Sequence, residues 1–111
     1  MRQLHLLPTP VHSYLLMELA DIASFDLAWL QDKLDPDVYF EGLLQSGVAR
    51  RHEWVRQEIL RNQNLVRQVW CEGDELWYWR FRIQGGISGS DGLVLLRNGR
   101  VFRVWCNGRI L

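Results

Sequence analysis

The sequence predicts an α+β fold, with three helices and a short strand in the first half and a curled antiparallel sheet in the second. Three observations favour this class. Up to residue 64, apolar residues recur every three or four positions, as on one face of a helix. Beyond residue 64, apolar and polar residues alternate, as in strands with one buried face. The length of 111 residues fits a single domain spanning 1–111.

The first half is predicted to be mostly helical. Residues 1–10 contain two prolines and are expected to form a loose arm. After the arm, Leu15, Leu19 and Ile22 lie at i, i+4 and i+7, which indicates an amphipathic helix. Pro36 is expected to end a second helix, because the residue before a proline is pushed out of the helical region. The expected elements are helices over 11–24, 25–34 and 48–62, and a strand over 37–42.

The second half is predicted to be four antiparallel strands. Turn signals separate the alternating stretches, and Asn98-Gly99 between two apolar strands is a strong hairpin signal because both residues favour positive φ. Connections this short require antiparallel neighbours. The expected strands cover 65–73, 74–85, 91–99 and 100–108.

Composition excludes several classes of function. The formal net charge is zero, which argues against a general nucleic-acid binder, and no apolar run approaches the length of a membrane span. Residues 1–49 carry a net charge of −5 and residues 50–111 carry +5, so the halves are expected to pair across the fold. We expect a cytoplasmic protein with two reduced, buried cysteines, since no signal peptide is evident. No metal or cofactor site is expected, because the histidines and cysteines lack ligand spacing.

Alternation along "LWYWRFRI" divides the central strand into two faces. Trp77, Trp79, Phe81 and Ile83 share one face, which we expect to pack on the helices. The other face mixes arginine with aromatic side chains, which is typical of the core of a protein–protein interface. We therefore predict a homodimer through this sheet face, formed by Tyr78, Arg80, Arg82, Arg103 and Trp105.

Three stretches together resemble a known superfamily. The stretch "SFDLAWLQDKLDPDVYFEG" is similar to a helix break followed by a helix and a "DD-V-F-E" strand. The stretch "VARRHEWVRQEIL" is similar to a "GREEVRAFL" helix. The stretch "DGLVLLRNGRVFRVW" is similar to a closing "D-V-L-RF-DGRI" hairpin. The chain thus resembles the nuclear transport factor 2-like superfamily over about residues 11–107, especially its SnoaL-like and ketosteroid-isomerase-like branches. The resemblance implies a cone-shaped barrel of cystatin-like type, with an apolar pocket between helices and sheet, and commonly a dimer.

The same resemblance weakens the case for isomerase chemistry. The carboxylate base of ketosteroid isomerases falls on Gly42 of this chain, and the neighbouring Glu41 points to the opposite face of the expected strand. The family's second acid falls near Asp91 or Gly92. Catalysis therefore has to be argued from individual residues.

Two residues are candidates for acid–base chemistry. His52 falls on the apolar stripe of the third predicted helix, and histidine titrates near neutral pH. The alternatives are a core histidine satisfied by a backbone carbonyl, or simply a residue at the pocket rim. Asp91 is a candidate proton donor if it lines an apolar pocket mouth, or else a turn residue at the start of a strand.

The aromatic residues predict a pocket. The expected ligand-binding residues are Tyr14, Trp29, Phe40, Trp54, Trp77, Trp79, Phe81 and Phe102, although core packing also explains most of them. The first hypothesis is a dimeric domain that binds a small hydrophobic molecule. The second is an enzyme of the same fold that performs isomerase-, dehydratase- or hydrolase-type acid–base chemistry on such a molecule. The third is a non-catalytic protein-interaction module.

Overall fold

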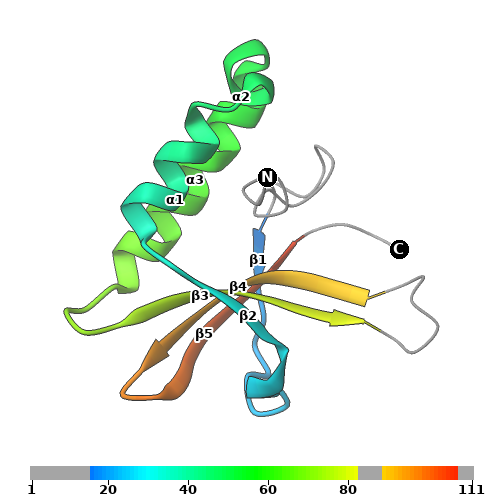
Figure 1. Cartoon of the computed structure of the whole chain (residues 1–111), viewed down its shortest axis with the longest axis vertical. Coiled ribbons are helices and arrows are strands. Elements are labelled where there is room, and N and C mark those ends of the chain that lie inside the picture. Colours follow the sequence, from blue (N-terminus) through cyan, green and yellow to red (C-terminus); the bar gives the residue numbers. More distant parts are fainter. Residues whose placement is uncertain (1–15, 83–88, 108–111) are drawn as a thin grey trace.

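The computed structural model describes residues 16–82 and 89–107 and has an α+β architecture. A five-stranded antiparallel sheet, in the order β1-β5-β4-β3-β2, carries a helical layer on one face (Figure 1). In chain order the elements are β1 (Leu16–Glu18), the 3-10 turn η3 (Leu27–Trp29), β2 (Leu30–Leu34), α1 (Pro36–Leu44), α2 (Gly47–Arg51), α3 (Glu53–Val69), β3 (Glu75–Arg82), β4 (Gly89–Arg97) and β5 (Arg100–Asn107).

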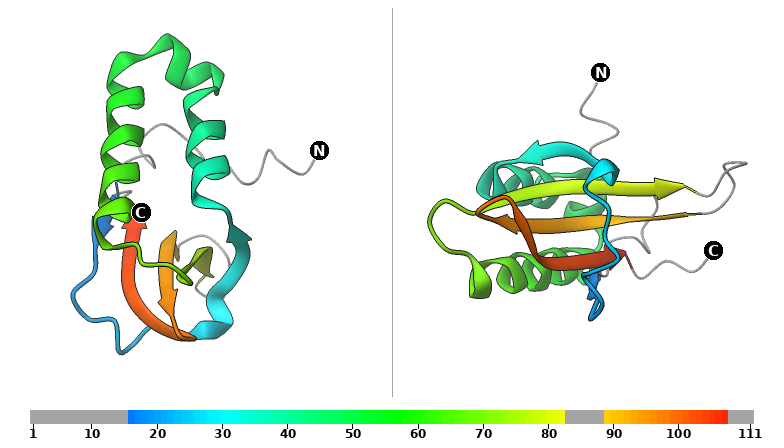
Figure 2. Two further views of the ribbon diagram at one scale, coloured as in Figure 1. Left: turned by 90° about the vertical axis from the view of Figure 1, so that its left-hand side faces the viewer. Right: turned by 90° about the horizontal axis from the view of Figure 1, so that it is seen from below.

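The helices lie between β2 and β3 in the chain, so the expected order with helices first is wrong. Figure 2 shows α1 and α3 running side by side as a hairpin that rises from the sheet, with α2 at its far end. The sheet is twisted (Figure 1). It is also open, because its outer strands β1 and β2 are not paired with each other. A closed cone is therefore not formed by the described strands.

The predictions for residues 16–42 are wrong in detail. The expected helix over 11–24 contains β1 and an irregular segment, and the expected helix over 25–34 contains η3 and β2. In β2, half-buried and exposed side chains alternate from Leu30 to Leu34. The predicted strand over 37–42 is helical, because the Asp35 carboxylate caps the backbone N–H groups of Asp37 and Val38. Pro36 therefore opens α1 at a position where its missing N–H costs nothing.

The third predicted helix is interrupted and longer than expected. Backbone angles at His52 are extended, which separates α2 from α3. The buried side chains of α3 follow a helical spacing through Val55, Ile59, Asn62 and Val66. This spacing continues the helix to Val69, so the predicted strand over 65–73 is wrong.

The last three predicted strands are confirmed as β3, β4 and β5. They form an antiparallel meander, and Asn98 and Gly99 occupy the β4–β5 turn with φ of 57° and 78°. This is the positive-φ geometry that the Asn-Gly pair favours in two-residue hairpins.

The alternation in β3 is also confirmed, but the helices cover the opposite face to the one expected. Leu76, Leu93, Leu95 and Trp105 are buried with the side chains of α1 and α3, and we call this the helix-facing side of the sheet. Trp79, Val94, Leu96 and Val104 form a second core on the other side, which we call the outer face. Alternation distinguishes two faces, but both are apolar here, so it does not say which one the helices cover.

Candidate ligand pocket on the outer face of the sheet

The chain between β1 and β2 crosses the outer face of the sheet. Two short polar turns fix its course. The Asp21 carboxylate accepts hydrogen bonds from the backbone N–H of Ala23 and the hydroxyl of Ser24. The Asp26 carboxylate caps η3 by accepting from the backbone N–H of Ala28. Such Asx turns hold a connection in place without a regular element.

These turns bring Phe25 and Trp29 onto the aromatic side chains of β3. The ring centroids of Phe25 and Trp29 are 5.1 Å apart, and Phe25 meets Trp79 edge-on at 5.4 Å. Trp29 also lies 5.9 Å from Trp79 and 4.9 Å from Phe81. Trp29 is therefore in contact with the other three rings, at distances typical of favourable aromatic pairs.

Trp79 is the fixed element of this aromatic cluster. Its indole Nε1 donates to the carbonyl oxygens of Leu93 at 3.1 Å and of Trp105 at 3.2 Å. To reach Trp105 on β5, the indole crosses β4 at Gly92, which is the register partner of Trp79. A Cβ on Gly92 would lie 2.0 Å from the carbonyl oxygen of Trp105. Only glycine fits at this position without displacing the backbone.

The aromatic cluster forms one wall of a pocket of about 280 Å³. The β1–β2 connection forms another wall, and side chains of β4 and β5 form the floor. Apolar and aromatic groups predominate, with two serines and one carboxylate among the described lining residues. These residues are Leu19, Asp21, Ser24, Phe25, Trp29, Trp79, Phe81, Ser90, Val104 and Cys106.

Three of the eight predicted ligand-binding residues line this outer-face pocket, namely Trp29, Trp79 and Phe81. Four others lie elsewhere. Phe40 is a buried residue of α1 in the helix-facing core, and Trp54 is 53% exposed on α3. Trp77 donates from its indole to Glu75, and Phe102 packs against two arginines. Tyr14 and Ile83 lie outside the described residues.

Sequence reasoning missed the residues that the β1–β2 connection contributes. The helical pattern predicts Leu19 and Asp21 in the helix over 11–24, and Ser24 and Phe25 at the start of the helix over 25–34. Aspartate and serine are, however, also typical of Asx and related turns. Val104 and Cys106 follow by alternation from Trp105 on β5, once the outer face is recognised as the pocket side.

The five predicted dimer-interface residues do not form a free surface. Tyr78 and Trp105 are buried on the helix-facing side, and Arg103 pairs with Glu18 at 3.1 Å. Arg80 and Arg82 are exposed. The expectation that this face lies open is wrong at Tyr78 and Trp105, which the helical layer covers. The homodimer itself stays a prediction.

The two candidate catalytic residues are not brought together. Asp91 is buried, and its carboxylate accepts hydrogen bonds from the Tyr78 hydroxyl at 2.8 Å and from the side-chain amide of Asn107. His52 is exposed at the junction of α2 and α3. Figure 1 shows α2 at the end of the helix pair farthest from the sheet. The expectation of an inward-facing histidine is wrong because the helix breaks at this residue.

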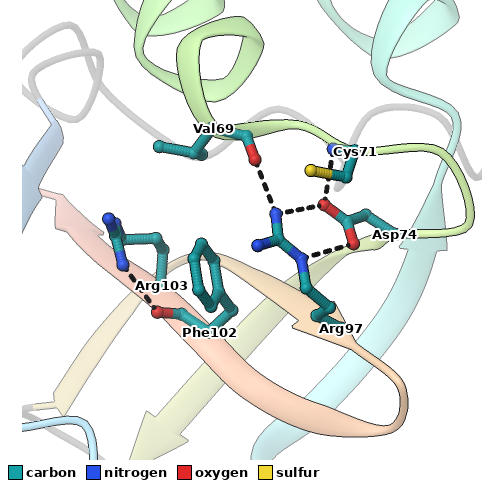
Figure 3. A network of polar contacts seen from close by, with 6 residues as sticks. All are labelled: Val69, Cys71, Asp74, Arg97, Phe102 and Arg103. Carbon is teal, nitrogen blue, oxygen red and sulfur yellow. Dashed lines mark hydrogen bonds and ion pairs between the residues drawn. The ribbon is translucent and has the colours of Figure 1, made fainter.

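A second polar network joins the end of α3 to the β4–β5 hairpin (Figure 3). The Arg97 guanidinium donates to both Asp74 carboxylate oxygens at 2.9 and 2.8 Å and to the carbonyl of Val69 at 2.7 Å. Hydrogen bonding and charge from Arg97 hold the pKa of the Asp74 carboxyl below its ordinary value, and Asp74 raises the pKa of Arg97 in turn. The backbone N–H of Cys71 also donates to Asp74.

Phe102 lies next to this network, with the guanidinium carbons of Arg97 and Arg103 at 3.7 and 4.4 Å from its ring centroid. A shallow hollow of about 540 Å³ nearby is lined by Arg97, Asn98, Arg100, Val101 and Phe102. Since Nε and Nη2 of Arg97 donate to Asp74 and Val69, we interpret this region as a structural tie between the helices and the sheet.

Both cysteines are free thiols. Cys71 is exposed and Cys106 is partly buried, so the expectation that both are buried is wrong. Within residues 16–82 and 89–107, no three histidine, cysteine or acidic side chains are grouped so that they could hold a metal ion. No helix in the described part of the chain is long and apolar enough to cross a bilayer.

Comparisons with protein-family models, curated proteins and solved structures found no match to this chain. Membership of the nuclear transport factor 2-like superfamily therefore stays a prediction.

Proposed function

We propose that this domain binds a small, largely apolar molecule in the outer-face pocket. The observation that supports the proposal is the pocket itself, whose walls combine four aromatic rings with a few polar groups. Ligand sites are typically apolar hollows of about 300–1,000 Å³ with a small number of polar groups that orient the ligand. A pocket of about 280 Å³ corresponds to a small ligand.

The shape of the pocket is supported by structure on both sides. Trp79 is anchored by two hydrogen bonds, and the Asx turns at Asp21 and Asp26 fix the β1–β2 connection. These contacts are made within the protein itself, so the fold holds the walls in place, and such preorganisation favours affinity.

A ligand screen tests the proposal. Small aromatic, terpenoid, steroid and acyl compounds are added to the protein, and tryptophan fluorescence and melting temperature are followed together. Trp29 and Trp79 line the pocket, so an occupant changes their emission. A ligand at about 100 times its dissociation constant adds about 2.7 kcal/mol of stability. If no chemically varied compound produces either signal, the proposal is wrong.

A protein partner is the second candidate, favoured by the apolar side chains around the pocket. Met17, Leu19 and Phe81 are 55%, 39% and 37% exposed. Met17 pairs with Cys106 and so shares the outer face with the two others. Exposed apolar groups gathered on one face are typical of interaction sites. A screen without hits, followed by self-association in sedimentation that Phe81→Ser abolishes, would favour this function.

A further inference from the structure

We propose that the ligand of the outer-face pocket is an organic cation, such as a molecule with a methylated ammonium group. This inference rests on the proposed function and specifies the chemical class of the ligand. Two features of the pocket support it, the sign of the charge at its rim and the aromatic character of its wall.

The charge at the rim is negative. Asp21 is the charged residue among the described pocket-lining residues. The segment from Leu19 to Trp29 also contains Asp26, and it has no lysine or arginine. Glu18, directly before it, is paired with Arg103. Each Asp21 oxygen accepts a single hydrogen bond, so both retain the capacity to accept another contact.

The arginines of β3 do not neutralise this rim. Arg80 and Arg82 occupy alternate positions to Trp79 and Phe81, so their side chains leave the strand on the helix-facing side. The described lining of the pocket therefore combines the Asp21 carboxylate with an aromatic wall and contains no basic residue. Lys33 on β2 shares the outer face with its register partner Trp77, but it is paired with Glu75.

The aromatic wall suits a cation that carries apolar groups. The faces of tryptophan and phenylalanine rings are negative and attract ammonium groups, most strongly in tryptophan. Trp29 is partly exposed and Phe81 is 37% exposed, so their π-systems are available to a ligand. Trp79 is 2% exposed and its indole N–H is bonded to two carbonyls, so this ring supports the wall while Trp29 and Phe81 present their faces to a ligand.

A metal ion fits the pocket less well than an organic cation. Hard cations such as Mg²⁺ and Ca²⁺ take about six or more oxygen ligands. The described lining offers one carboxylate and two serine hydroxyls beside seven apolar or thiol side chains. A methylated ammonium group instead buries its methyl groups against the rings and places its charge near the carboxylate.

Two probes of the same shape test the inference. Phenyltrimethylammonium carries a positive charge, and tert-butylbenzene is its neutral counterpart. Both are titrated against the full chain by tryptophan fluorescence. We expect phenyltrimethylammonium to bind about tenfold more tightly, a difference that falls with added salt. Asp21→Asn should remove most of the preference, since asparagine can still accept from Ala23 but lacks the charge.

Asp26→Asn is the matched control. The substitution removes one negative charge from the same segment, and asparagine keeps an oxygen that can cap η3. Residue 26 does not line the pocket. The inference predicts that this variant retains most of the preference for the cation. An equal loss in both variants would overturn a specific role for Asp21.

The binding results for the two probes test the cation inference separately from the proposed ligand-binding function. Equal binding of the two probes contradicts the cation inference and leaves an apolar ligand site in place. Binding of neither probe also contradicts the cation inference, and the broader ligand screen then decides whether the pocket binds small molecules at all.

Discussion

Trp79 and Gly92 are register partners on neighbouring strands, and the side chain of the first crosses the backbone of the second. The indole spans β4 to reach the carbonyl of Trp105 on β5. The two residues thus join three strands on the outer face and set the position of the pocket wall. The pocket depends on a glycine that does not itself line it.

Gly92→Ala is expected to destabilise the domain by more than about 2 kcal/mol, since a Cβ would lie 2.0 Å from the carbonyl oxygen of Trp105 and would displace the backbone. Urea unfolding followed by circular dichroism measures the change. Gly42→Ala is the control, because Gly42 lies within α1 with no atom near its Cβ position. This control should gain about 0.5–1 kcal/mol. Similar stability of the Gly92 variant and the wild type would contradict the close approach of Gly92 to the backbone of β5.

The Asp74–Arg97 pair is expected to make stability depend on pH in the acid range. The folded-state pKa of Asp74 lies below its unfolded value, so its contribution is fully present above about pH 4 and is lost as the pH falls through the folded pKa. Asp74→Asn should therefore be less stable at pH 7 and lose less of its remaining stability on acidification. Urea midpoints at pH 7 and pH 3 test this.

Glu72→Gln is the control for the Asp74 experiment. Glu72 is exposed in the neighbouring turn and makes no ion pair with any described residue. Its variant should follow the acid dependence of the wild type. If Asp74→Asn shows the same acid dependence as the wild type, the ion pair does not contribute as described.

The start of α1 is expected to depend on Asp35. Its carboxylate accepts from the N–H groups of Asp37 at 3.0 Å and Val38 at 3.2 Å. Asp35→Ala should cost about 1 kcal/mol in unfolding free energy, and Asp35→Ser should restore most of it. Chemical denaturation of both variants measures the difference. No rescue by serine would indicate that the loss arises from something other than capping.

The fold was predictable where local chemistry is unambiguous. The Asn98-Gly99 turn and the alternation in β3 to β5 follow from backbone preferences and a period of two. Asp35-Pro36 was ambiguous, because a proline can follow the end of a helix or occupy its first turn. The spacing of Leu15, Leu19 and Ile22 also matched a helix, yet Leu16–Glu18 pair with β5. Pairing with a strand far along the chain outweighs a local pattern.

Part of the pocket lining was predictable from the sequence, but the face of the sheet that carries the pocket was not. Aromatic content alone indicated Trp29, Trp79 and Phe81 as ligand residues, and all three line one pocket. The face of the sheet was assigned wrongly, because Tyr78 and Trp105 on one face and Trp79 and Phe81 on the other are equally aromatic. Asp21 and Phe25 line the pocket because the β1–β2 connection packs on the outer face, and this packing is not visible in the local sequence pattern.

The most direct test of ligand binding uses N-phenyl-1-naphthylamine, a neutral probe whose emission rises in apolar sites. We expect saturable binding with one site per chain. Trp54→Ala, which alters an exposed residue on α3, should leave it unchanged. Ser90→Phe, which fills the pocket from its floor, should weaken binding at least tenfold while circular dichroism shows an intact fold. Equal binding by Ser90→Phe and the wild type would contradict the outer-face pocket as the ligand site.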